Sequence, residues 1–174
     1  MGRESILWAI IGFLVLSAVF HFGSLNFPDS DSFYYMGLSS LFKERGIFDV
    51  SFPWLYHTVI RDLSASLWFG FGLLLIPFTL FPSSIFGLKL AGVFLTSAII
   101  AAVYFVLKRL NIKMPVFWAL FTIFAAPNVL THFLMVRPQA ASLALAPLLF
   151  YFLLRNSFWG ILVSSFGIFW LHMN

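Results

Sequence analysis

The stretch LAGVFLTSAIIAAVYFVL, residues 90–107, decides the fold class, because it carries no charge and ends directly at Lys108 and Arg109. A helix needs about 20 mainly apolar residues to cross a hydrocarbon core of roughly 30 Å. Inside lipid, all of its backbone hydrogen bonds must be made within the segment. We therefore expect a membrane-crossing helix here, with the two bases at one membrane surface.

Four further stretches have the same character. They are residues 5–20, 114–136, 138–154 and 156–174. Pro115 stands where a helix tolerates proline, whereas Pro127 is expected to kink the third span. No small-residue cleavage site follows residues 5–20, so this segment is expected to remain as a signal anchor. The sequence predicts an all-α polytopic membrane protein with about five transmembrane helices, and residues 1–174 form a single membrane domain.

Composition supports this fold class and excludes others. Of the 174 residues, 61% are hydrophobic and only 9% are charged, whereas a soluble domain is about 25% charged. The chain has no cysteine, which excludes disulfide frameworks, thiol nucleophiles and cysteine-based metal sites. The net charge is +4, but the bases are scattered and form no basic stripe, so no nucleic-acid partner is expected.

Residues 63–81 are long enough to cross the membrane, but Gly70, Gly72 and Pro77 make them a poor uninterrupted helix. If they only dip into the membrane or lie in its interface, the bases at 108–113 and Arg155 all fall on the cytoplasmic side, as the positive-inside rule prefers. This arrangement places the N-terminus in the cytoplasm and the C-terminus outside. Residues from about 24 to 84 then form the first outer loop.

That loop holds every acidic residue except Glu4, and its first pair is Asp29-x-Asp31. Apolar residues follow at helical spacing as far as Phe42, and Gly46 is a plausible helix end, which suits a helix lying in the membrane interface. The pair can act as a general base or bind a divalent cation such as Mg²⁺ or Mn²⁺. Alternatively, one aspartate caps the helix and the other is solvated.

Several basic and polar residues are expected on the same outer face. Arg137 lies in Val-Arg-Pro-Gln, with His132 upstream and Gln139 just after it. An arginine at this depth can bind phosphate through two parallel hydrogen bonds, or it can reach out to lipid headgroups. Further candidates on this side are His172, His57 and Arg61.

An ordered set of short motifs runs along the whole chain: DSDSFYYMGLSSLFKERGIFD, SFPWLYH, VRPQAASLALAPLLFYFLLRN and FWLHMN. This set resembles the N-terminal part of GT-C-type membrane glycosyltransferases, in the bacterial multispanning group related to protein mannosyltransferases and aminoarabinose transferases. The resemblance implies a bacterial inner-membrane enzyme that transfers a sugar from a polyprenyl-phosphate donor outside the cytoplasm. It also implies an essential acidic residue ahead of aromatics in the first outer loop, which Asp31 or Asp29 matches.

The roles implied by the resemblance can be assigned to individual residues. Asp31 would deprotonate the acceptor, and Asp29 would assist it or bind the cation. Arg137, His132 and His172 would offset charge on the departing phosphate. Weaker candidates for the same cavity are His57 and Arg61, whereas Gln139 is grouped with Arg137 and His132 at the phosphate. Family members have more spans, so the remainder of the module or a partner chain is expected beside the lipid-linked donor and membrane lipids.

Two other classes of function remain open. A transporter subunit is expected to have charges within its spans, or broken helices in matched halves, and neither is visible in the sequence. A non-catalytic membrane assembly factor would have the same hydropathy but would not need the aspartate pair.

Overall fold

The computed structural model describes residues 3–23, 29–48, 68–125 and 127–172, and all regular structure within these ranges is helical. The elements are α1 (Arg3–Gly23), α2 (Asp31–Arg45), α3 (Phe69–Leu75), the 3-10 helix η2 (Ile76–Leu80), α4 (Ser84–Arg109), α5 (Pro115–Phe124), α6 (Pro127–Leu134), α7 (Pro138–Leu154) and α8 (Phe158–Leu171). The predicted all-α class is therefore confirmed for the part of the chain that is described.

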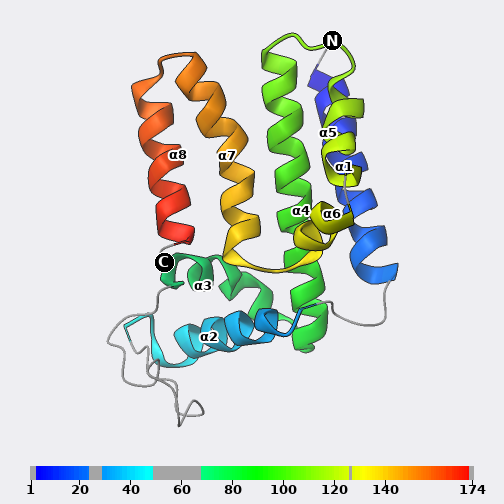
Figure 1. Ribbon diagram of the computed structural model, residues 1–174. Coiled ribbons are helices and arrows are strands. Elements are labelled where there is room, and N and C mark those ends of the chain that lie inside the picture. Colours follow the sequence, from blue (N-terminus) through cyan, green and yellow to red (C-terminus); the bar gives the residue numbers. More distant parts are fainter. Residues whose placement is uncertain (1–2, 24–28, 49–67, 126, 173–174) are drawn as a thin grey trace.

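The longer helices run side by side, and α2 and α3 lie across one end of them (Figure 1). The central helix is α4, which contacts α1 on one side and α7 on the other and also packs against α5. Helix α8 packs against α7 and reaches α3. The N-terminus lies at the end opposite α2 and α3, together with the C-terminal end of α4 and the turn between α7 and α8 (Figure 1).

Among the described residues, two helices are long and apolar enough to cross a membrane, namely Ile6–Gly23 within α1 and Ser84–Arg109. Helices α5, α7 and α8 are apolar but shorter, with 10, 17 and 14 residues. The prediction of five spans is therefore not confirmed. In the third expected span, residues 114–136, the helix is broken near Pro127, where only a kink was predicted. Neither of the two resulting helices is long enough to cross a membrane. Helix α5 ends at Phe124, and Pro127 begins α6, which lies across the bundle (Figure 1).

The described part of 63–81 consists of α3 and η2, with Pro77 inside the 3-10 helix, and residues 63–67 lie outside the described ranges. The two elements lie across the end of the bundle and do not pass through it (Figure 1). This agrees with the expectation that the segment dips in or lies at the surface.

Helix α2 has the expected bounds. Gly46 ends it with a φ of 92°, a left-handed conformation that glycine adopts without steric cost, and its N–H donates to the Phe42 carbonyl. The buried face of α2 consists of Ser32, Tyr35, Met36, Leu38, Ser39, Leu41 and Phe42. This face packs against α3, η2 and the start of α4.

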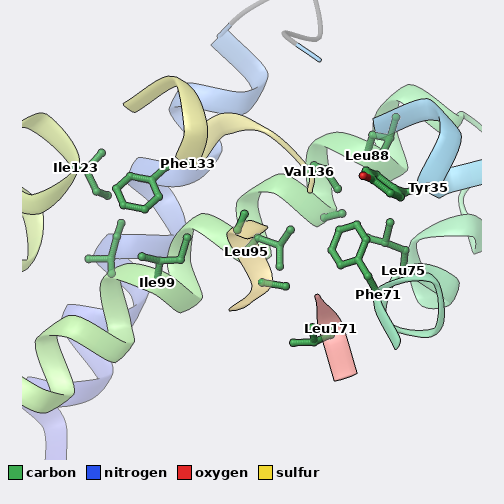
Figure 2. Close-up of a cluster of buried hydrophobic side chains, with 14 of the residues drawn as sticks. Tyr35, Phe71, Leu75, Leu88, Leu95, Ile99, Ile123, Phe133, Val136 and Leu171 are labelled. Carbon is green, nitrogen blue, oxygen red and sulfur yellow. The ribbon is translucent and has the colours of Figure 1, made fainter. Parts of the chain in front are cut away.

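The main hydrophobic cluster joins the crosswise helices to the bundle. Phe71 and Leu75 from α3 meet Leu88 and Leu95 from α4, and Val136 from the α6–α7 turn lies beside them (Figure 2). All five are at most 2% exposed. Burial of such side chains stabilises a fold by about 1.5–3 kcal/mol each. The end of the bundle that carries α2, α3 and the start of α7 is thus held as one packed unit.

Candidate functional site

A bidentate ion pair joins Asp29, just before α2, to Arg137, just before α7. Arg137 Nε donates to Asp29 Oδ2 at 3.0 Å, and Arg137 Nη2 donates to Asp29 Oδ1 at 2.6 Å. The Asp29 side chain is 1% exposed and that of Arg137 is 31% exposed. The structure therefore brings together an acid and a base that are 108 residues apart in the chain.

The local backbone explains how the two side chains meet. Arg137 precedes Pro138 and has an extended conformation, with φ −128° and ψ 155°, as expected for a residue before proline. Asp29 lies just before α2, where its Oδ1 accepts from the backbone N–H of Asp31 at 3.2 Å. Ser32 donates to Asp29 Oδ2 at 2.7 Å, and its oxygen lies 3.2 Å from the Val136 carbonyl. Ser30 occupies the N-cap position of α2 and makes no capping hydrogen bond through its side chain, so neither aspartate caps the helix in the expected way. Of the helix N–H groups, Asp29, one residue earlier, accepts only from the first.

Asp31 occupies a different environment from Asp29. It is the first residue of α2, and its Oδ2 lies 3.0 Å from Arg137 Nη2. Its side chain remains 55% exposed. Of the two carboxylates, Asp31 is therefore the one that an acceptor molecule can reach.

The protonation states follow from these contacts. Burial by itself raises the pKa of Asp29, but hydrogen bonds from Arg137 and Ser32 outweigh it, so the pKa lies below its ordinary value of 3.8. The hydrogen bond with Asp29 raises the pKa of Arg137. Burial, aided by the charge of Asp31, raises the pKa of Tyr35 to about 12, so its phenol stays neutral. Formally, two carboxylates face one guanidinium, which leaves the cluster with one surplus negative charge.

Two cavities flank this cluster. Asp31, Tyr34, Tyr35 and Trp68 line a cavity of about 270 Å³. A smaller cavity of about 130 Å³ is lined by Arg137, His132, Gln139, Ala140 and Leu143. Arg137 thus lines the smaller cavity itself, and it contacts Asp31 in the lining of the larger one.

The remaining candidates lie less centrally. His172 lines a separate cavity of about 310 Å³ between α7 and α8, which it shares with Gln139 but not with Arg137. His57 and Arg61 lie outside the described residues. Ser32 and the aromatic residues Tyr34, Tyr35 and Trp68 were not among the predicted site residues. Tyr34 and Tyr35 follow Asp31 directly, so the aromatic run could have pointed to them, but no sequence signal places Trp68 beside them.

The carboxylates as they lie do not fit a divalent cation. Both oxygens of Asp29 accept from Arg137, and they accept further from Ser32 and the Asp31 N–H. A cation ligand to Asp31 would lie next to the same guanidinium. Within the described ranges, no group of three histidine or acidic side chains could hold a metal ion. The cation stays a prediction, and no step below depends on it.

Comparison of the chain with protein families, with curated proteins and with solved structures finds no match.

Proposed function

We propose that this chain forms the front part of a membrane glycosyltransferase. It would move a sugar from a polyprenyl-phosphate donor to an acceptor on the outer side of the membrane. One observation supports this most strongly. The exposed carboxylate of Asp31 lies 3.0 Å from a guanidinium that a buried carboxylate fixes in place, at one end of an apolar helix bundle.

The distribution of bases supports the orientation. Lys108 and Arg109 end α4, and Arg155 follows α7, so these bases lie at the N-terminal end of the bundle, opposite α2 and α3 (Figure 1). Under the positive-inside rule that end is cytoplasmic and the Asp31 end is outside. In this proposal α7 and α8 also lie in the membrane. At 17 and 14 residues, they reach about 25 and 21 Å, which suits a locally thinned bilayer.

The proposed reaction is a direct displacement at the anomeric carbon. Asp31 accepts the proton of an acceptor hydroxyl as the acceptor oxygen bonds to that carbon. The bond between the carbon and the phosphate oxygen breaks, and its electron pair leaves with the lipid phosphate. A positioned general base contributes about 10²–10⁴-fold to such a rate.

Arg137 stabilises the departing phosphate. Asp29 accepts from its Nε and Nη2, and Asp31 also lies against Nη2, so in this proposal the anion binds through Nη1. His132 and Gln139 line the cavity beside Arg137 and can donate to the same phosphate oxygens. Asp29 acts as a positioning residue, because it fixes the plane of the guanidinium and does not touch substrate. A fixed cation is more effective at a leaving group than a mobile one.

A non-catalytic assembly factor is the second candidate function. The contacts from Ser32 and Arg137 to Asp29 tie α2 to the start of α7 whether or not any reaction takes place. In that case the cluster would serve only to hold the crosswise helices to the bundle.

Binding of polyprenyl phosphate by the purified chain in nanodiscs tests the proposal. Removing a charge-assisted hydrogen bond costs about 1.5–3 kcal/mol, so Arg137→Ala should weaken binding about ten- to a hundred-fold. Arg155→Ala, at the opposite end of the bundle, is the matched control and should change nothing. The double variant Asp29→Asn/Arg137→Gln avoids a buried unpaired charge and should weaken binding as much as Arg137→Ala. Equal affinity in all of these proteins would favour the assembly factor.

A further inference from the structure

We propose that Asp31, Tyr34, Tyr35 and Trp68 form a binding site for an alkylammonium group. This site goes beyond the proposed sugar transfer and does not depend on it, because its cavity is separate from the one in which the lipid phosphate would bind. The four side chains come from the first turn of α2 and from the residue before α3, and together they line the cavity of about 270 Å³.

The three aromatic rings stand nearly at right angles to one another. The interplanar angles are 77° for Tyr34 with Tyr35, 84° for Tyr34 with Trp68, and 74° for Tyr35 with Trp68. The centroids are 5.4, 5.7 and 5.7 Å apart in the same order. Each pair of rings therefore meets edge to face, and all three aromatic residues line the same cavity.

The spacing of the rings suits a cation. A cation binds a ring face within about 6 Å of its centroid. A group about 4 Å from two perpendicular faces requires centroids about 6 Å apart, close to the distances observed. Clusters of aromatic rings recognise ammonium groups because each ring has a negative face.

The charge of the site also favours a cation. Asp29 and Asp31 together carry one more charge than Arg137 balances, and Asp31 is the carboxylate that is exposed and lies on the cavity wall. The Tyr35 phenol remains neutral and keeps its ring available as a wall. An anionic guest would meet both this carboxylate and the faces of the rings. The lining therefore favours an ammonium group over a phosphate.

The size of the cavity limits the guest. Drug-sized ligands occupy pockets of about 300–1,000 Å³, so 270 Å³ suits a small headgroup. The ammonium can belong to a soluble amine, such as ethanolamine or an amino sugar, or to the headgroup of an ethanolamine phospholipid. All of these candidate ligands carry a compact cation on a short polar group.

Titration of the full chain in neutral detergent micelles with choline tests this site, with binding followed by calorimetry. The control ligand is 3,3-dimethylbutan-1-ol, which has the shape of choline without its charge. Choline should bind at least about ten-fold more tightly than the alcohol, because cation–π attraction and the carboxylate act only on the charge. Equal affinity for the two ligands would overturn the proposal, because it would show that the cavity does not recognise the positive charge.

Variants locate the binding. Trp68→Ala and Asp31→Asn should each weaken choline binding about ten-fold, whereas Trp68→Phe keeps an aromatic wall and should retain most of it. The matched control is Trp159→Ala on α8, where the side chain is exposed. If Trp68→Ala and Trp159→Ala bind choline alike, the site is wrongly placed and the proposal fails.

Competition then distinguishes the sources of the ammonium. Displacement of choline by ethanolamine or glucosamine would support a soluble amine. Displacement by phosphatidylethanolamine in the micelle, but not by phosphatidylglycerol, would support a lipid headgroup. Failure of every ammonium compound to compete would overturn the proposal. None of these outcomes depends on sugar transfer, so the two proposals can fail separately.

Discussion

Asp29 and Asp31 are two positions apart in the sequence, and their surroundings give them different roles. Asp29 is almost fully enclosed and accepts hydrogen bonds from Arg137, Ser32 and the start of α2. Asp31 is more than half exposed and has one charged contact, to the same arginine, among the described residues. We therefore propose that Asp29 positions Arg137 and that Asp31 is the candidate general base.

The first prediction concerns the stability of these two positions. Asp29→Asn should lower the free energy of unfolding by about 3 kcal/mol, because it leaves a partly buried guanidinium without its main partner. Asp31→Asn should lower it by less than about 1 kcal/mol, because exposed ion pairs contribute little. Denaturant unfolding in micelles, followed by near-ultraviolet circular dichroism, measures both. Equal losses would contradict the different roles given to the two carboxylates.

The second prediction is a dependence of stability on pH. The pKa of Asp29 is lower in the folded chain than its ordinary value of 3.8. Its contribution is thus fully present above that value and is lost as the pH falls through the folded pKa. Stability of the wild type should therefore decline below a pH of about 4, and Asp29→Asn should flatten this decline. An unchanged acid limb in the variant would show that Asp29 is not the group responsible.

Part of the site could be predicted from residue types alone. The aspartate pair, Arg137 and the side of the bundle on which they lie follow from charge and span counting. The division of roles does not, because it depends on a contact across 108 residues. Trp68 escaped prediction for the same reason, since only the packing of α3 against α2 brings it to Tyr34.

At the scale of elements, the close approach of α1 and α4 depends on a small residue. A Cβ placed on Gly92 would clash with the His21 ring at Cε1. The His21 ring is held in place by Thr96, whose Oγ1 lies 3.1 Å from Nε2 and donates to the Phe133 carbonyl at 2.8 Å. This polar link joins α1, α4 and α6 inside the bundle.

The third prediction uses this contact. Gly92→Ala should destabilise the chain by about 1–3 kcal/mol, because the imidazole cannot move without breaking its bond to Thr96. The control is Gly12→Ala on α1, which has nothing within 4 Å of the new methyl group. That variant should be neutral or gain up to about 1 kcal/mol from helix propensity. Thermal unfolding of the two proteins compares them, and a similar midpoint would refute a tight α1–α4 contact.

Some elements follow from local sequence and others do not. Helix α2 was predictable because its apolar spacing and Gly46 are local signals, and α4 because it is uniformly apolar. The break between α5 and α6 was expected only as a kink. Pro127 fits either the inside or the start of a helix, and the choice depends on how α6 packs on α4.

At the scale of the whole molecule, the account requires the two ends of the bundle to face opposite sides of a membrane. The fourth prediction tests this by cysteine labelling, which is clean because the chain has no cysteine. Asn111→Cys should stay unlabelled by an impermeant thiol reagent in intact cells, whereas Glu44→Cys should react. Labelling of position 111 together with protection of position 44 would invert the orientation and place Asp31 in the cytoplasm.

We propose that Asp31 acts in sugar transfer from a lipid-linked donor. Turnover of radiolabelled polyprenyl-phosphate sugars by membranes that contain the protein, with Asp31→Asn compared with Asp31→Glu, tests this role. Asp31→Asn removes the general base and should lower turnover by about 10²-fold or more at unchanged expression. Asp31→Glu keeps a carboxylate and should retain part of the wild-type turnover. Wild-type turnover in Asp31→Asn, or no transfer by the wild type from any such donor, would contradict the account.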